Sequence, residues 1–287
     1  MKGSVFDPRE YAYKAGLAAD YMRGLIGSQK FVVGKMFQVK INVASLKKSP
    51  DQSSEQVSEL LFGEEIIIYE IVNAWAWGQS HNDGYVGYVS MDHISSKVQE
   101  NTHEVTALRA FVYRQPDIKA PTITCLSMSS QLSITHSKGL FAHIENLGWI
   151  FEKSIRALGG IESDFVSVAQ KFTGTPYLWG GRSSFGIDCS GLVQLSLSGV
   201  GVLCPRDTDQ QASSVGSPIN DEITKLLRGD LIFMNGHVAI MVDRHTILHA
   251  NAFHMSVELE SLDGFLSRLK QDNIHIGQMR RPSLPSR

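Results

Sequence analysis

The sequence predicts an α+β protein in which an amino-terminal helical segment and two small β-barrels precede a larger mixed domain. Three observations support this class. From residue 36 short apolar runs alternate with turn residues, a similar alternation returns after residue 100, and helical patterns join the strands after Gly159-Gly160. The expected domains are residues 1–35, 36–100, 101–158 and 159–287.

The composition allows a buried core and does not favour a polyanionic partner. The chain has 287 residues, 43% of them hydrophobic, and its 27 Lys and Arg nearly balance 29 Asp and Glu. The formal net charge is −2, with no polybasic stretch and no apolar run long enough to cross a bilayer. We therefore expect neither nucleic acid nor a membrane as partner, and no obligate protein partner is predicted.

The amino end and the cysteines favour the cytoplasm. Polar residues from Asp7 to Glu10 stand where a signal peptide needs its apolar centre. Cys125, Cys189 and Cys204 form an odd, widely spaced set without the CxxC pairs of zinc ribbons or redox motifs. A reducing compartment suits this set.

The elements of the first three domains follow from apolar spacing. Between residues 7 and 30 apolar side chains recur at roughly helical spacing, which predicts one or two packed helices. From Gln38 the stretches "QVKINVASLKKSPD", "ELLFGEEIIIYEIV", "AWAWGQSH" and "YVGYVS", with a turn at residues 82–84, predict five short strands and a small β-barrel.

A weaker echo of this barrel begins at Glu104. Both stretches start with a strand followed by a Pro-Asp pair, at residues 50–51 and 116–117, and both end in an aromatic-tipped strand, at residues 85–89 and 148–151. This predicts a tandem repeat of about 55 residues per unit. We interpret the second unit as a spacer that orients the last domain, which opens with a helix over residues 164–172 capped by Asp164.

Cys189 is the candidate nucleophile. In "YLWGGRSSFGIDCSGLVQ", residues 177–194, an irregular loop gives way to a helix at this cysteine. A thiol at a helix N-terminus is expected to have a lowered pKa, and the backbone N–H groups there can receive an oxyanion. A buried structural cysteine is the alternative.

His237 and His249 are the candidate base and its orienting partner. Strands over residues 237–242 and 246–250 flank a polar turn, and a hairpin centred on Asp243 would place the two histidines directly opposite each other. One imidazole could then fix the tautomer of the other and leave a nitrogen to face Cys189. Half-buried strand histidines, or a zinc site made with Cys189, are the alternatives.

Residues 164–280 resemble the NlpC-type papain-like cell-wall cysteine peptidases. The resemblance rests on "GTPYLWGG", "DCSGLVQ", "PRDTDQQ", "LRGDLIFM", "GHVAIMV" and "LHAN". It implies a papain-like fold with Cys189 as nucleophile, His237 as base and His249 as its orienter, and it implies no cofactor and no metal.

The amino half, through "ELLFGE", "WAW" and "DGYVGYV", resembles the SH3-like domains of the cytoplasmic γ-D-glutamyl-L-diamino-acid endopeptidases. Such enzymes recycle murein peptides and cut L-Ala-γ-D-Glu-diamino acid between D-Glu and meso-diaminopimelate or Lys, with the L-Ala amine free. The resemblance implies a set of substrate-binding residues: Asp188, Ser190 and Thr208 at the amine end, Arg206 beside them, Tyr177 and Trp179 lining the cleft, and Glu64 and Tyr85 from the first barrel. Thr208 departs from the Ser often found there but keeps the hydroxyl.

The expected function is therefore hydrolysis of a γ-D-glutamyl bond in a murein tripeptide by a cytoplasmic cysteine peptidase. An exported hydrolase that trims intact peptidoglycan is one alternative. A catalytically inactive peptide-binding protein is another, and an acyltransferase on the same fold is a third.

Overall fold

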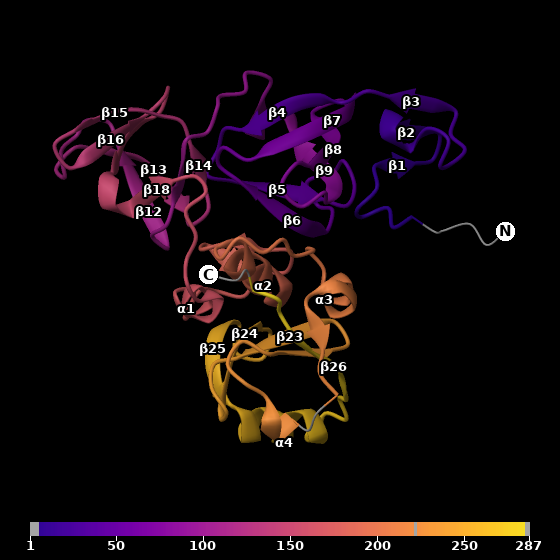
Figure 1. Ribbon diagram of the computed structural model, residues 1–287. Helices are drawn as coiled ribbons and strands as arrows, with labels where there is room; N and C mark the ends of the chain where they lie inside the picture. Colours follow the sequence, from indigo (N-terminus) through magenta and orange to yellow (C-terminus); the bar gives the residue numbers. More distant parts are fainter. Residues whose placement is uncertain (1–5, 221–222, 285–287) are drawn as a thin grey trace. The chain divides into compact units, whose positions relative to one another are not determined.

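A computed structural model describes residues 6–220 and 223–284 of the chain. The chain forms two compact units, one ending at Leu158 and the other beginning at Gly159 (Figure 1). Strands dominate the first unit, whereas the second combines a sheet with α-helices.

The amino-terminal segment forms a small sheet, and the prediction of helices there is wrong for the residues that the structure describes. The sheet has the order β1-β2-β3. Its elements are β1 (Tyr13–Lys14), β2 (Leu17–Ala19), the 3₁₀ turn η1 (Asp20–Met22) and β3 (Lys30–Val32). Gly16, with φ +76°, closes the tight turn between β1 and β2. Leu17 and Ala19 are buried with Trp77 of the following domain, so tertiary packing overrides the helical spacing.

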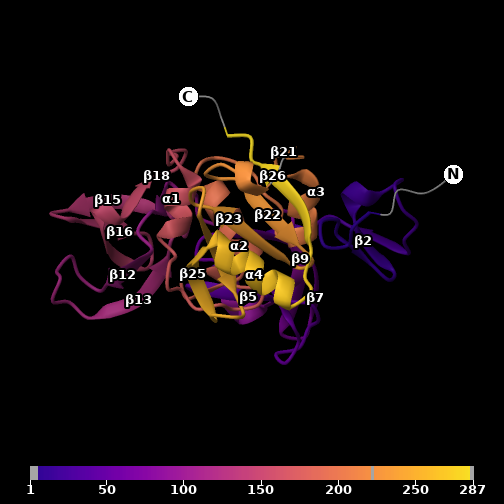
Figure 2. The ribbon, with the colours of Figure 1, turned by 90° about the horizontal axis from the view of Figure 1, so that it is seen from below.

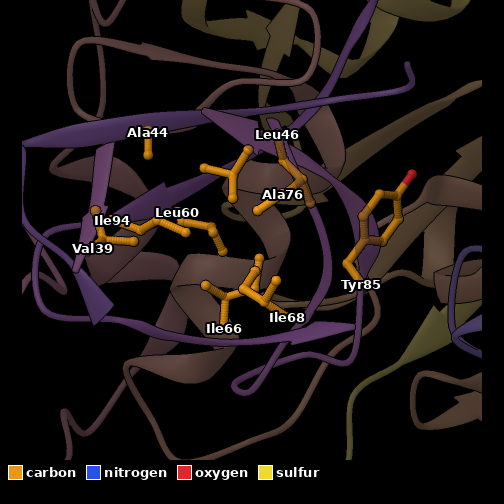
Figure 3. Close-up of a cluster of buried hydrophobic side chains, with 10 residues drawn as sticks. Val39, Ala44, Leu46, Leu60, Ile66, Ile68, Ala76, Tyr85 and Ile94 are labelled. Atoms are coloured by element: carbon orange, nitrogen blue, oxygen red, sulfur yellow. The ribbon is translucent and has the colours of Figure 1, made fainter. Parts of the chain in front are cut away.

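The first β domain is a seven-stranded antiparallel sheet in the order β10-β4-β7-β8-β9-β5-β6. Its elements are β4 (Lys35–Val39), β5 (Val43–Lys47), β6 (Gln56–Leu61), β7 (Glu65–Val72), β8 (Trp75–Ser80), β9 (Val86–Ser90), the 3₁₀ turn η2 (Met91–His93) and β10 (Ile94–Ser95). Alternate apolar side chains such as Leu46, Leu60 and Ile66 point inward and make the core (Figure 3). Five strands were expected and seven form; one of the two further strands, β10, has only two residues, too few for alternation to reveal.

The second β domain contains two antiparallel sheets, in the orders β14-β11-β18 and β13-β12-β17-β16-β15. Its elements are β11 (His103–Val105), β12 (Arg109–Tyr113), β13 (Thr122–Ser127), β14 (Gln131–Leu132), β15 (Ile134–Lys138), β16 (Phe141–Ile144), β17 (Gly148–Phe151), the 3₁₀ turn η3 (Glu152–Ser154) and β18 (Ile155–Ala157). Phe62 of the first domain packs against this core, and its carbonyl accepts the Gln131 N–H at 2.8 Å. The two β domains are thus joined within one unit.

The two β domains end with the same backbone conformation. β9, η2 and β10 close the first, and β17, η3 and β18 close the second. The residue after each 3₁₀ turn has nearly the same dihedral angles, φ −123° and ψ 163° at Ile94 and φ −131° and ψ 161° at Ile155. This shared ending is the clearest structural sign of a repeat.

The second unit is built on a six-stranded antiparallel sheet in the order β21-β26-β22-β23-β24-β25. The elements of the unit are α1 (Phe165–Gln170), β19 (Arg182–Ser183), β20 (Gly186–Ile187), α2 (Cys189–Ser198), α3 (Thr208–Ser214), β21 (Ser217–Pro218), the 3₁₀ turn η4 (Ile223–Lys225), β22 (Leu231–Met234), β23 (His237–Met241), β24 (Thr246–Asn251), β25 (Ser256–Ser261), α4 (Leu262–Gln271) and β26 (Ile276–Arg281). Helix α2 contacts β23 and β24, and α4 packs on the sheet through a cluster that includes Met241, Ile247 and Phe265 (Figure 2).

Two helix starts expected from the sequence are confirmed. Asp164 caps α1 by accepting the Val166 N–H at 3.1 Å, and α2 begins at Cys189. Among the helices of residues 6–220 and 223–284, none has the length and apolar character that crossing a bilayer requires.

Candidate active site

Cys189 is the first residue of α2, and the local sequence explains its position. Asp188 caps the helix by accepting the Gly191 N–H at 2.7 Å. A Cβ atom at Gly191 would lie 2.5 Å from the carbonyl oxygen of Gly181, so only glycine allows this close approach. The Cys189 Sγ lies 3.9 Å from the Gly236 carbonyl oxygen and receives the N–H of Val238. The sulfur therefore sits against the main chain on either side of His237.

The thiol of Cys189 is neutral in the free protein. Burial raises its pKa to about 11, and the neighbouring Asp188 carboxylate adds to the rise. The Val238 N–H, Thr208 and Arg206 act in the opposite direction without overcoming burial. The lowered pKa expected at a helix N-terminus is thus wrong for the free protein, because Cys189 is only 5% exposed. A base must take the proton when the sulfur attacks.

His237 and His249 are hydrogen-bonded to each other, with Nε2 of His237 3.0 Å from Nδ1 of His249. A hairpin centred on Asp243 would place them directly opposite each other, and this expectation is wrong. Ile240 pairs with Leu248 and Met241 with Ile247, so the hairpin is centred one residue later and His249 lies diagonally from His237. Diagonal neighbours share a face, and the imidazole rings span the extra distance.

Both histidines are neutral at neutral pH. Burial lowers the pKa of His237 to about 4, with a smaller contribution from Arg268. The pKa of His249 is lowered to about 3, mainly by burial and also by the positive forms of His237 and Arg268. A neutral His237 keeps a nitrogen lone pair that can accept a proton, which a general base requires.

The outer edge of His249 faces two further polar groups. Among the residues that the structure describes, His249, His254 and Glu260 bring potential metal ligands within 4.8 Å of one another. The Arg268 guanidinium lies 2.6 Å from the Glu260 carboxylate and already supplies a positive charge there. This set differs from the zinc set of Cys189, His237 and His249 considered from the sequence.

Asp188 and Arg206 form a buried ion pair beside Cys189. Arg206 Nη1 donates to Oδ1 of Asp188 at 2.9 Å and Nη2 donates to Oδ2 at 2.7 Å. The Gly180 N–H, the Gly191 N–H and the Ser190 hydroxyl also donate to this carboxylate. The carboxylate is therefore fully hydrogen-bonded within the protein.

Three other predicted substrate-binding residues lie in the same unit. The Thr208 hydroxyl oxygen lies 3.9 Å from the Cys189 sulfur. Burial raises the pKa of Tyr177 to about 12, with smaller contributions from the nearby Cys189 and Asp188 side chains. Trp179 is 59% exposed. The structure thus brings Thr208 and Tyr177 close to the sulfur, and their contact with substrate stays a prediction.

Glu64 and Tyr85 belong to the first β domain and are both buried. The Glu64 carboxylate accepts the Leu61 N–H at 2.8 Å and the Asn82 amide at 2.9 Å. The Tyr85 ring lies at the edge of the barrel core, and its hydroxyl points away from the other labelled side chains (Figure 3). Both have structural partners in this domain, and their role in substrate binding also stays a prediction.

Sequence reasoning missed Glu260 and Arg268. Glu260 lies on β25 and Arg268 on α4, and neither falls in a quoted motif. An acidic residue that alternates with apolar ones in "SVELES" is the only trace in the sequence, and it is typical of many half-exposed strands.

Two family models match separate parts of this chain. An NlpC/P60 family model matches residues 174–273, and a model described as bacterial dipeptidyl-peptidase Sh3 domain matches residues 46–94. The dipeptidyl-peptidase 6 of Lysinibacillus sphaericus is 27% identical over 256 residues, which are 80% of this chain and 93% of that protein. A γ-D-glutamyl-L-lysine dipeptidyl-peptidase of Bacillus subtilis is 28% identical over 71% of this chain and 75% of its own length.

The fold agrees with these matches. The crystal structure of an NlpC/P60 family protein from Bacillus cereus superposes with a TM-score of 0.73 at 20% identity, over 88% of this chain and 100% of that one. With a cysteine at the start of α2 and a histidine pair on the adjacent sheet, this chain carries a cysteine peptidase domain of the NlpC/P60 type together with a bacterial dipeptidyl-peptidase SH3 domain.

Proposed function

We propose that this peptidase hydrolyses the bond between γ-D-glutamate and the diamino acid in murein peptides that have a free amino-terminal L-Ala. The observation that carries the proposal is the array of Cys189, His237 and His249 within the NlpC/P60 domain. The names of the Bacillus relatives, γ-D-glutamyl-L-lysine dipeptidyl-peptidases, support the substrate class. The expected substrates are murein tripeptides released from peptidoglycan.

The geometry supports acyl transfer with His237 as general base. The neutral thiol of Cys189 loses its proton to His237 as the sulfur attacks the γ-carbonyl carbon, which forms a tetrahedral intermediate that becomes a thioester when the C–N bond breaks. The Cys189 backbone N–H at the start of α2 stabilises the oxyanion together with a neighbouring donor. His237 then protonates the leaving amine of the diamino acid. Water, deprotonated by His237, hydrolyses the thioester and releases L-Ala-γ-D-Glu.

We assign the amine end of the substrate to the side of Cys189 that carries Asp188, Ser190 and Thr208. Five donor groups already occupy the Asp188 carboxylate, so it supports this side by holding Gly180 and Ser190 in place. Arg206 neutralises the carboxylate and fixes it. Tyr177 and Trp179 line the remaining approach to the sulfur.

The preceding domains have a supporting role in this proposal. The matching ends of the two β domains support residues 101–158 as a second SH3-like barrel that acts as a spacer. Glu64 and Tyr85 in the first domain are assigned to substrate recognition. Three cysteines that form no disulfide within the described residues support a cytoplasmic location, which fractionation of cells expressing the full chain tests.

One assay tests the reaction directly. Purified protein is incubated with L-Ala-γ-D-Glu-meso-diaminopimelate or with the Lys tripeptide, and the products are identified by mass spectrometry. The expected products are L-Ala-γ-D-Glu and the free diamino acid, and Cys189→Ala protein should form neither. Cleavage of intact peptidoglycan in preference to both tripeptides would contradict the proposal and favour wall trimming.

A further inference from the structure

The outer nitrogen of His249 has no role in the triad described above. Its side chain is 0% exposed, and within the described residues Nε2 has no hydrogen bond of good geometry. Oε2 of Glu260 lies 3.1 Å from this nitrogen. A buried ring nitrogen this close to a carboxylate is favourable when it carries a proton and repulsive when it presents a lone pair.

The proton on Nε2 decides which form His237 takes. A single hydrogen lies between Nε2 of His237 and Nδ1 of His249. When His249 is protonated on Nε2, its Nδ1 is an acceptor, His237 donates from Nε2, and Nδ1 of His237 keeps its lone pair. When His249 is protonated on Nδ1 instead, the neutral His237 carries its proton on Nδ1 and has no lone pair left to accept one.

We infer that Glu260 is a positioning residue that holds His249 in the Nε2-protonated form and so keeps Nδ1 of His237 free to accept the thiol proton. The inference rests on the proposed triad of Cys189, His237 and His249. It extends that triad by one carboxylate, which acts through His249 and touches neither the substrate nor the sulfur.

Neighbouring elements hold the Glu260 carboxylate in place. Arg268 of α4 donates to Oε2 from Nη2 at 2.6 Å, and its guanidinium lies over the rings of Phe253 and Phe265, at 4.7 and 5.5 Å from their centroids. Phe265 also meets the His249 ring edge-on at a centroid distance of 5.5 Å. The carboxylate therefore has little freedom to turn away from His249.

Several other charged or titratable groups face this pair. His254 lies beyond His249 with ring centroids 6.3 Å apart, Arg268 approaches from α4, and Asp188 acts on His237 from the start of α2. Glu258 pairs directly with His249 across the two strands, and its carboxylate accepts the Ser256 hydroxyl at 2.8 Å. Glu258 thus offers a matched control, a carboxylate two residues from Glu260 on the same face of β25.

The experiment compares the full-length wild type with Glu260→Gln, Glu260→Ala and Glu258→Gln. Three measurements are made: kcat and KM for the free tripeptide, the pH dependence of kcat/KM, and the ¹⁵N chemical shifts that distinguish the two imidazole tautomers. We expect kcat to fall about 10- to 100-fold in Glu260→Ala with KM nearly unchanged. Glu260→Gln, which keeps an acceptor, should lose less, and Glu258→Gln should match the wild type.

Glu260→Ala should also differ from the wild type in the pH dependence of kcat/KM and in its NMR spectrum. Without Glu260 the charge of Arg268 is unbalanced beside the histidines, so the acid limb of kcat/KM should move to lower pH. The Nε2-protonated signal of His249 should weaken. A Glu260→Ala protein that folds and keeps the wild-type kcat, pH profile and tautomer would overturn the inference; if it does not fold, the same three results for Glu260→Leu, which also lacks an acceptor, decide.

Failure of the proposed function is distinguishable from failure of this inference. The tautomer measurement needs no substrate, and the alkylation rate of Cys189 by iodoacetamide provides a second readout without peptide. If the wild type does not cleave the tripeptide but its His249 is Nε2-protonated and Glu260→Ala changes that state, the substrate is wrong and the positioning role stands. If the tripeptide is cleaved equally well by all the variants, the positioning role is wrong.

Discussion

Replacement of Arg206 by Met provides a sharp test of how burial sets the value of an ion pair. The Arg206 and Asp188 side chains are 1% and 11% exposed and share two hydrogen bonds. The chain supplies a matched control, since Arg228 pairs with Asp164 at 2.6 Å and those side chains are 42% and 35% exposed. Asp188 and Asp164 both cap a helix, α2 and α1, so burial is the main difference between the two pairs.

The expected costs differ several-fold. Removing Arg206 leaves a buried carboxylate without its counter-charge, which should lower the free energy of unfolding by about 3–5 kcal/mol. Removing Arg228 breaks an exposed pair, which should cost about 0–1 kcal/mol. Asp188→Asn in the Arg206→Met background keeps a helix cap while removing the charge, so it should restore more than half of the loss.

Thiol labelling in urea measures these costs in the second unit. Cys189 and Cys204 are buried there, whereas Cys125 lies in the first unit, so mass spectrometry of the labelled peptides follows each unit separately. Equal costs for Arg206→Met and Arg228→Met would refute the burial argument. A double variant no more stable than Arg206→Met would show that lost packing, and not the charge, accounts for the cost.

Four further predictions follow from the site and the first domain. Cys189→Ala should abolish tripeptide cleavage with little change in thermal stability, and near-normal activity of this variant in a steady-state assay would contradict the mechanism. His249→Ala should lower kcat by about 10²- to 10⁴-fold, because His237 loses the partner that orients it. The folded chain keeps His237 and His249 neutral below their ordinary pKa of 6.5, so the unfolded chain binds more protons as the pH falls. The free energy of unfolding should therefore drop from pH 6.5 towards pH 4, by about 3 kcal/mol from His237 alone. Urea titrations at several pH values check this, and His237→Phe should flatten the dependence on pH. Acetylation of the L-Ala amine should reduce kcat/KM strongly, and equal cleavage of both peptides in a competition assay would remove the free-amine requirement. Glu64→Ala should destabilise the first β domain by about 1–3 kcal/mol, because the Leu61 N–H and the Asn82 amide lose their acceptor. Glu64→Gln should raise KM for the tripeptide if Glu64 recognises the substrate. An unchanged KM would leave Glu64 a purely structural residue.

Local signals predicted the catalytic domain better than the amino-terminal segment. The start of α2 at Cys189 follows from an Asp cap and a glycine approach, which are encoded within a few residues. The segment before residue 33 is different, since its strands are stabilised by Trp77, more than forty positions away in the chain. Helical spacing there carries no information about that partner, so the sequence favoured the wrong element.

The site shows the same division between local and distant information. The strands that carry His237 and His249 were predictable from apolar runs around a polar turn, but a shift of one residue at the turn changed which side chains pair. Glu260 reaches His249 from the next strand and is held by Arg268 from α4. Only the assembled sheet and helix bring these groups together, which explains why no motif marks them.

Cys189 is only 5% exposed and its thiol is neutral, so the nucleophile should resist oxidation in the resting enzyme. Hydrogen peroxide converts thiolates to sulfenic acids, and a cysteine with a pKa of about 11 presents almost no thiolate at neutral pH. The nucleophile becomes reactive only when a carbonyl is in place and His237 takes the proton. A peptidase built in this way should retain its activity in peroxide concentrations that inactivate enzymes whose resting nucleophile is ionised.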